Sequence, residues 1–325
     1  MNNTDTKGVN VSGVVVEICG SFFIVLEHVF AIFLISKCRI VQTSVKILVT
    51  NLCTIDIIAG FWGCIRATLR FYLTDERMLC MLDILLTTWV FNVSAFLVSA
   101  IAIDRYISVF FPMKYTSIVD KSVFGIACFV MWSLGAVLSV VTLFIEFSYT
   151  KEKGCAIRMS QQEVFPWILV SLRFICICII AYSYSRMYMK ILSLGKRYAG
   201  MKRIELRSIA KILLIVTPHL ILHAFYIVMF LFQPVFNIHK SLMYESLFTT
   251  AVIFVDTWIY VVRFKECRIN MAIYLCYCRR GLCEENIKKR KLLYGTFLDI
   301  DNPDHQQTSI WRLDVLCGDL YWVLL

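Results

Sequence analysis

Long apolar runs alternate with short polar links along most of this chain. Runs of about 20 apolar residues are long enough to cross a lipid bilayer as helices. Seven such runs are found, at about 11–36, 44–72, 79–111, 122–147, 164–192, 206–232 and 241–264. A shorter amphipathic run, 265–276, follows the seventh. The pattern predicts an all-α membrane protein, a seven-transmembrane helix bundle with a short amphipathic eighth helix.

The links between the runs are too short to hold a separate soluble domain. We therefore expect an N-terminal segment at 1–10, a transmembrane domain with its eighth helix at 11–276, and a C-terminal tail at 277–325. The tail ends in an apolar stretch that is too short to span a membrane. The sequence shows no internal repeat, which argues against an inverted-repeat transporter.

Composition agrees with a membrane protein, because 59% of the residues are hydrophobic and only 17% are charged, whereas soluble domains are nearer a quarter charged. The formal charge of +10 comes from short basic clusters between the apolar runs. Such clusters are typical of juxtamembrane segments beside lipid, and they do not indicate a nucleic-acid partner. Lys and Arg are concentrated in the first, third and fifth links, which predicts that these links are cytoplasmic and that the N-terminus is extracellular. We expect a multi-pass protein of the plasma membrane.

A charged and aromatic motif closes the third apolar run. The stretch "DRYISVFFPMKY" places Asp104, Arg105 and Tyr106 together and continues to Pro112 and Tyr115. Charges at the edge of an apolar helix are costly and usually have a partner or a function. The motif is therefore a candidate working part rather than only the end of a helix.

The spacing of other residues from Arg105 extends this pattern. Cys80 lies 25 residues before Arg105 and Trp132 lies 27 residues after it. The phrases "NLCTID" at 51–56 and "DTWIY" at 256–260 fall in the second and seventh runs. Over residues 11–276 the chain resembles the rhodopsin-like (class A) G-protein-coupled receptors, orphan subfamily. The resemblance implies a receptor that converts binding of an extracellular ligand into activation of a heterotrimeric G protein, and not an enzyme.

The resemblance also assigns roles to single residues. It implies a disulfide bond between Cys80, at the outer start of the third helix, and Cys155 in the second outer loop; disulfides persist on that oxidising side. It implies an activation switch and G-protein contact made of Asp104, Arg105, Tyr106, Pro112, Tyr115 and Tyr260. Asn2 and Asn10 head glycosylation sequons on the outer side. Cys276 and Cys278 are candidates for palmitoylation beside the membrane.

A polar core is expected in the middle of the bundle. Asp56 lies well inside the second helix, where an acid must be paired, hydrated or protonated. In the family this aspartate and a serine, here Ser94, help to hold a sodium ion. The chain departs from the family at Asp256 and His28, which both replace asparagine. A sodium ion and a hydrogen-bonded core without an ion therefore remain open, and no other cofactor or metal is expected.

The class of ligand is narrowed mainly by the absence of residues that bind known ligands in related receptors. Thr87 stands where amine receptors carry an aspartate, and Thr250 stands where opsins carry the retinal lysine, so we expect neither an amine nor retinal. Arg66 and Arg173 lie within apolar helices and suit an anionic ligand group. The alternatives are internal ion pairs with Asp83, Glu163 or Glu245, or a side chain that reaches the headgroups. The pocket candidates are Arg66, Thr87, Phe91, Asn92, Arg173, His223, Tyr226 and Thr249.

The sixth helix departs most from the family. The usual Cys-Trp-x-Pro block is absent, and the run offers "LLIVTPHLILHAFYIVMF" with Pro218 near its cytoplasmic end. This departure keeps a second hypothesis open, a non-signalling seven-helix protein that acts as a ligand sink or heteromer partner. A channel or transporter is a third hypothesis, although the buried acids lie where the receptor family has them.

Overall fold

The computed structural model describes residues 11–39, 41–72, 76–118, 121–150, 154–157, 164–197, 220–221, 224–225, 227–228, 253–254, 265–275 and 286–292. Five of the predicted runs form helices within this part of the chain: α1 (Val11–Ser36), α2 (Thr43–Tyr72), α3 (Glu76–Phe110), α5 (Lys121–Glu146) and α6 (Val164–Arg197). The short amphipathic run forms α9 (Lys265–Leu275). The predicted runs 206–232 and 241–264 lie almost wholly outside the described residues.

All five long helices are apolar and long enough to cross a membrane. Their outward faces carry large exposed apolar side chains, such as Phe129 and Phe144 on α5 and Phe174 on α6. In water such a surface would be unfavourable, but lipid tails solvate it at no cost. The distribution of exposed apolar residues therefore confirms a multi-pass membrane protein.

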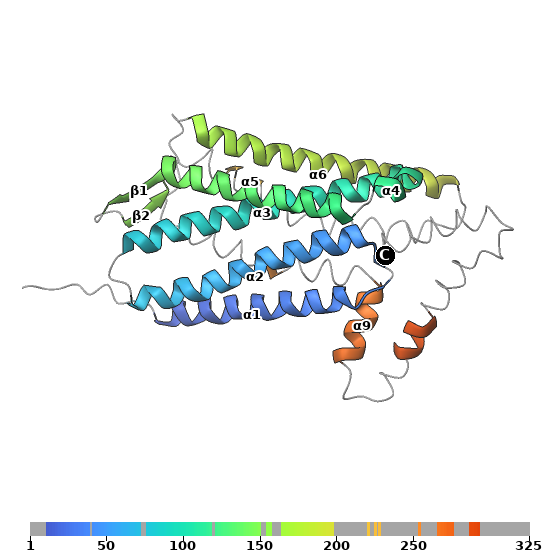
Figure 1. The fold of residues 1–325 in the computed structure, drawn as a ribbon, viewed down its shortest axis with the longest axis horizontal. Coiled ribbons are helices and arrows are strands. Elements are labelled where there is room, and N and C mark those ends of the chain that lie inside the picture. Colours follow the sequence, from blue (N-terminus) through green and yellow to red (C-terminus); the bar gives the residue numbers. More distant parts are fainter. Residues whose placement is uncertain are drawn as a thin grey trace, which may run out of the picture.

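The long helices run along one common direction, as Figure 1 shows. α2 packs between α1 and α3, and α3 also contacts α5 and α6. The apolar core lies among these helices and includes Leu34, Leu48, Leu97, Ile101 and Ile180, all with almost no exposed surface. α3 is thus the central helix of the described part, so polar groups at its two ends can touch most of the other elements.

Small residues allow α1 and α2 to approach closely. A Cβ atom at Gly60 would lie 2.8 Å from Val25 Cγ2 and 2.9 Å from the backbone oxygen of Ser21. A Cβ atom at Gly63 would collide with the Ser21 hydroxyl. Close backbone approach at small residues is the usual way in which transmembrane helices gain packing energy, because lipid removes the hydrophobic drive between them.

An aromatic contact joins α5 to α2 and α3. Trp132 Nε1 donates a hydrogen bond of 3.1 Å to Asn51 Oδ1, and the Trp132 ring meets Trp89 edge to face at 5.5 Å between centroids. A buried indole needs an acceptor for its N–H group. The Trp132 position inferred from the spacing to Arg105 is therefore an interhelical contact, and it fixes α5 against the centre of the bundle.

A short hairpin follows α5 at one end of the bundle (Figure 1). Strand β1 (Phe147–Thr150) pairs antiparallel with β2 (Gly154–Ile157), with Tyr149 opposite Cys155. Both strands contact α3. The all-α prediction holds for the membrane domain, and the hairpin is a local addition that the apolar pattern did not predict, because each strand has only four residues.

At the other end, α9 packs against the loop that follows α1. Glu266 Oε1 accepts a hydrogen bond of 2.5 Å from the backbone N–H of Arg39. The buried thiols of Cys38 and Cys267 are in contact, and Asn270 Nδ2 donates to Cys38 Sγ at 3.8 Å. The hydrogen bond to Cys267 and burial raise the pKa of Cys38 far above its usual range. This junction holds the start and the end of the membrane domain together.

Candidate functional site

Arg105 lies at the centre of a buried polar network near the C-terminal end of α3. Its Nε donates a hydrogen bond of 2.8 Å to Asp104 Oδ2, and its Nη2 also contacts that oxygen. Nη2 donates a second hydrogen bond of 2.7 Å to Gln42 Oε1, just before α2. Arg105 is 2% exposed and Asp104 is 4% exposed. Charge-assisted hydrogen bonds of this kind are among the stronger contacts in proteins, so the guanidinium is firmly held.

Tyr115 completes this Arg105 network, which we define as Asp104, Arg105, Gln42 and Tyr115. Tyr115 lies in α4 (Pro112–Ile118), a short helix after α3. Its hydroxyl lies 2.8 Å from Asp104 Oδ1, 3.3 Å from Arg105 Nη2 and 2.6 Å from Ser44 Oγ. Burial raises the pKa of Tyr115 to about 12. Tyr115 therefore stays neutral at physiological pH and can donate to the carboxylate.

The remaining motif residues have different surroundings. Tyr106 points away from the network, and its ring stacks on Phe110 at 4.6 Å and lies 6.0 Å from Tyr182 of α6. Pro112 is the first residue of α4, a position that suits proline because no helical partner for its missing N–H is needed. Lys190 Nζ donates to the Val109 carbonyl at 2.5 Å, so α6 satisfies an end carbonyl of α3.

A second polar group lies inside the bundle between α1 and α2. His28 Nε2 is 3.3 Å from Asp56 Oδ2, and the two side chains are 0% and 4% exposed. His28 Nδ1 lies 2.8 Å from the Ile24 carbonyl oxygen. Ser94 on α3 has a buried hydroxyl with no hydrogen-bond partner among the described residues. The structure thus pairs His28 with Asp56, two of the four residues predicted for the polar core.

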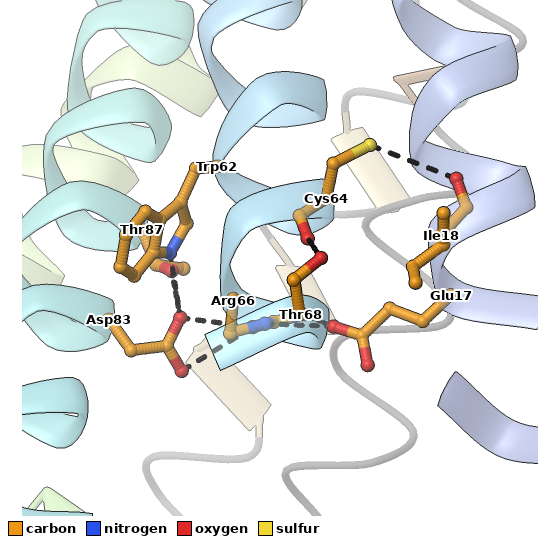
Figure 2. Close-up of polar contacts among 8 residues, drawn as sticks. All are labelled: Glu17, Ile18, Trp62, Cys64, Arg66, Thr68, Asp83 and Thr87. Carbon is orange, nitrogen blue, oxygen red and sulfur yellow. Dashed lines mark hydrogen bonds and ion pairs between the residues drawn. The ribbon is translucent and has the colours of Figure 1, made fainter. Parts of the chain in front are cut away.

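A third polar group joins α1, α2 and α3 at the end of the bundle opposite Arg105. Figure 2 shows Arg66 between Glu17 and Asp83. Arg66 Nε and Nη2 donate to Glu17 Oε1 at 2.8 and 2.5 Å, and Nη1 donates to Asp83 Oδ1 at 3.0 Å. Asp83 also accepts from Trp62 Nε1 at 2.9 Å and from Thr87 Oγ1 at 3.4 Å. Of the hypotheses for Arg66, the internal ion pair with Asp83 is present, and Glu17 adds a second carboxylate.

Arg173 has another kind of environment. It lies in α6 and is 4% exposed. Its guanidinium carbon lies 4.1 Å from the centre of the Phe91 ring, and Nη2 donates a hydrogen bond of 3.3 Å to Asn92 Oδ1. Three pocket candidates that were inferred separately from the sequence therefore lie together. Thr87 is not part of this group, because its hydroxyl donates to Asp83 in the Arg66 cluster.

Cys80 lies near the N-terminal start of α3, where it is buried and disulfide-bonded. Cys155 lies in β2, and β2 contacts α3. This placement is compatible with the pairing that the resemblance implies, which stays a prediction. Nine further candidate residues lie outside the described part of the chain: Tyr260, Asp256, His223, Tyr226, Thr249, Asn2, Asn10, Cys276 and Cys278.

Comparison with known families agrees with this geometry. The family model described as 7 transmembrane receptor (rhodopsin family) matches residues 27–274, which is most of the chain and includes all three polar groups except Glu17. The chain belongs to the rhodopsin family of seven-transmembrane receptors. A search of curated proteins finds no match. Receptors of this family are in general not enzymes and couple extracellular ligands to G proteins.

The family implies a sodium ion at Asp56, so the fit of this receptor's residues can be tested. Sodium is a hard cation that prefers oxygen ligands, and imidazole nitrogens suit other metals. In this receptor an imidazole nitrogen already faces the Asp56 carboxylate at 3.3 Å. Ser94 offers a buried hydroxyl and Glu27 offers a buried carboxyl group, each without a hydrogen-bond partner among the described atoms. A buried acid without a partner is held neutral, and neutral oxygens from two residues do not make a cation site. The described donor set does not fit a sodium ion.

Several residues of these groups were not found from the sequence. Gln42 and Ser44 lie in and beside a short loop of ordinary polar composition, so no pattern marks them as partners of the receptor's Arg105 network. Glu17 and Glu27 were also missed. Glu27 is a buried acid of α1, and neither of its carboxylate oxygens has a hydrogen-bond partner among the described residues. An acid within an apolar run is a usable signal, and it could have identified both.

Proposed function

We propose that this receptor responds to an extracellular ligand by activating a heterotrimeric G protein, and that the Arg105 network holds the resting state. One observation supports the proposal most: Arg105 is buried and bonded to Asp104, Gln42 and Tyr115 at the predicted cytoplasmic end. A guanidinium in these contacts cannot bind another protein. It becomes available only when α3 and its neighbours rearrange, which makes the network a two-state element that a ligand can bias.

The proposed location of the receptor in the plasma membrane depends on how its helices are oriented in the bilayer. The excess of Lys and Arg in the first, third and fifth links supports a cytoplasmic Arg105 network and an extracellular N-terminus. The Cys80 end of α3 then faces the oxidising side, in keeping with its disulfide. We propose that the receptor acts in the plasma membrane, where an extracellular ligand can reach it.

The test of signalling is the substitution Asp104→Asn in the full-length receptor. It removes the negative charge that holds Arg105, and hydrogen bonds to charged groups are worth about 1.5–3 kcal/mol. The active fraction should therefore rise on the order of 10-fold or more while it is small. Ligand-independent activation is measured in cells against a panel of G proteins, at matched surface expression.

Ser36→Ala provides the control, because this exposed hydroxyl bonds only its own helix at Phe33, and its basal signal should equal that of the wild type. If Asp104→Asn reaches the surface and activates no G protein, the proposal fails. That result would favour the non-signalling ligand sink or heteromer partner that the altered sixth helix suggested.

For the ligand, we propose an anionic group, such as a carboxylate, that binds Arg173. Arg66 is already matched by two carboxylates, whereas the contacts described for Arg173 are an amide oxygen and an aromatic ring. A planar guanidinium over a ring can bind a carboxylate through two parallel hydrogen bonds.

Screening of carboxylate-bearing metabolites, lipids and peptides tests this ligand class. Arg173→Lys keeps the charge but loses the planar fork, and Arg173→Gln loses both, so potency should fall in the order wild type, Lys, Gln. The total loss should be about 10-fold or more, as for the loss of a charge-assisted hydrogen bond. If every active ligand lacks an anionic group, or if Arg173→Gln keeps full potency, the anionic-ligand proposal fails.

A further inference from the structure

The pair His28 and Asp56 is enclosed within the membrane domain. His28 belongs to α1 and Asp56 to α2, and both lie within helices that can cross a membrane. His28 Nε2 and Asp56 Oδ2 are 3.3 Å apart. An isolated carboxylate in such a place would be very costly, so Asp56 depends on its contact with His28.

The positions of hydrogen atoms in this pair follow from its acceptors. His28 Nδ1 lies 2.8 Å from the Ile24 carbonyl oxygen, and a carbonyl can only accept, so Nδ1 carries a hydrogen. Nε2 faces a carboxylate oxygen, which is also an acceptor when it is ionised. A favourable contact therefore needs one hydrogen between Nε2 and Oδ2. Whichever atom carries that hydrogen, the pair as a whole is electrically neutral.

The neutral pair itself leaves no net negative charge for a diffusible cation. Glu27, the acid beside His28 on α1, has carboxyl oxygens without a hydrogen-bond partner among the described residues, so it is stable in this interior only when it is protonated and neutral. A sodium ion at Asp56 would have to displace the imidazole, or else bring an uncompensated positive charge into a low-dielectric interior, which is strongly unfavourable. We propose that His28 takes the place of the sodium ion, so that this receptor carries the partner of Asp56 in its own chain. Its resting structure then does not depend on sodium.

The partner of Asp56 is a side chain of α1, His28, and so it is covalently attached to the receptor. A diffusible ion can leave when the bundle rearranges, but a side chain of α1 cannot. His28 therefore ties α1 to α2 in the same region where Gly60 allows their backbones to approach closely. We expect α1 and α2 to move as one unit between the receptor's conformations, with the buried pair intact in each of them.

The test is the thermal unfolding of the purified full-length receptor in sodium chloride and in choline chloride at equal ionic strength. It needs neither ligand nor G protein, so its outcome is independent of the signalling proposal. The wild-type melting temperature should be the same in both salts. His28→Asn leaves Asp56 without its imidazole partner, and sodium should then raise the melting temperature by about 2–4 °C at several times its dissociation constant.

The double variant His28→Asn/Asp56→Asn is the control, and it should lose this sodium effect. The proposal would be overturned if sodium raised the melting temperature of the wild type and Asp56→Asn abolished that rise. This comparison does not involve His28→Asn, so it tests the proposal even if that variant does not fold. Sodium insensitivity of a folded His28→Asn receptor would overturn it as well, because the imidazole would then not be what keeps sodium out.

Discussion

The hydroxyl of Tyr115 lies 2.8 Å from Asp104 Oδ1, so α4 is bonded to the same carboxylate that holds Arg105. The two carboxylate oxygens of Asp104 accept hydrogen bonds from different groups: Oδ2 from the Arg105 guanidinium and Oδ1 from the Tyr115 hydroxyl. A movement of α4 therefore changes the environment of the carboxylate that restrains Arg105. The position of α4 and the hydrogen bonds that hold Arg105 are therefore coupled through Asp104.

Tyr115→Phe should raise ligand-independent signalling in the same direction as Asp104→Asn, but by less. The change removes the hydrogen bonds of the phenol to Asp104, Arg105 and Ser44, each worth about 1 kcal/mol, and leaves the bond between Asp104 and Arg105 in place. An increase of about 3–10-fold in basal G-protein activation is expected. Basal activation that is unchanged or lower at equal surface expression would show that the phenol does not restrain Arg105.

Alkaline pH should destabilise the wild type more than Tyr115→Phe. The pKa of Tyr115 is raised by burial to about 12, whereas an unfolded tyrosine titrates near 10. Between about pH 10 and pH 12 the unfolded chain therefore loses a proton that the folded protein keeps. The contribution of Tyr115 to the free energy of unfolding is therefore fully present below pH 10 and is lost as pH rises to about 12. The loss is on the order of 2 kcal/mol. Melting temperatures of both proteins across this range provide the comparison, and equal losses would refute the assignment.

Arg66→Ala should destabilise the receptor. The change leaves Glu17 and Asp83 without their guanidinium partner. These side chains are 17–29% exposed, so the cost should lie between that of a surface pair and that of a buried pair, about 1–3 kcal/mol. Adding Glu17→Gln and Asp83→Asn should recover part of the melting temperature. A normal melting temperature together with loss of the ligand response would instead assign Arg66 to ligand binding.

Gly60→Ala should destabilise the contact between α1 and α2 by about 1–3 kcal/mol. The new Cβ atom would meet Val25 and the backbone oxygen of Ser21, and a backbone atom cannot rotate away. Gly125→Ala on α5 is a matched control, since nothing lies within 4 Å of its Cβ position; its higher helix propensity should leave stability equal or increased. If both variants melt at the same temperature, α1 and α2 are not packed this closely.

Cys38 should react slowly with alkylating reagents in the folded receptor. It is buried, and its raised pKa keeps it a thiol rather than the reactive thiolate. Glu266→Ala removes the hydrogen bond that holds α9 to the Arg39 backbone, so labelling of Cys38 should become about 10-fold faster, as for the loss of a charge-assisted bond. Mass spectrometry after timed alkylation measures the rate. Fast labelling in the wild type would contradict the described junction.

The sequence predicted the helices well because each membrane span must be long, apolar and helical to satisfy its backbone. α1 begins and ends where the apolar run does, and α2, α3 and α5 differ from theirs by at most a few residues. The charged positions Arg105, Asp56 and Arg66 were also found, since a charge in an apolar run is conspicuous. Such positions can be identified from the sequence alone, whereas their roles stay predictions.

The partners could not be predicted in the same way. Gln42 and Arg105 are 63 residues apart in sequence, and nothing in an apolar pattern specifies how one helix is rotated against the next. In the sequence Arg66 and Arg173 are both single arginines within apolar helices. In the structure Arg66 contacts two carboxylates, whereas Arg173 contacts an aromatic ring and an amide oxygen. That difference depends on which helix faces each residue, and only the packed structure contains it.

The contact between Cys38 and Cys267 joins positions 229 residues apart. During synthesis the first helices enter the membrane long before Lys265 leaves the ribosome, so the groups at Cys38 and Arg39 must wait for α9. Contacts between distant positions close late because the intervening chain must be ordered first. A chain that ends before α9 therefore lacks the contacts that α9 makes with the Cys38 thiol and the Arg39 backbone N–H, so this junction forms only once residues as late as Glu266 and Cys267 have been made.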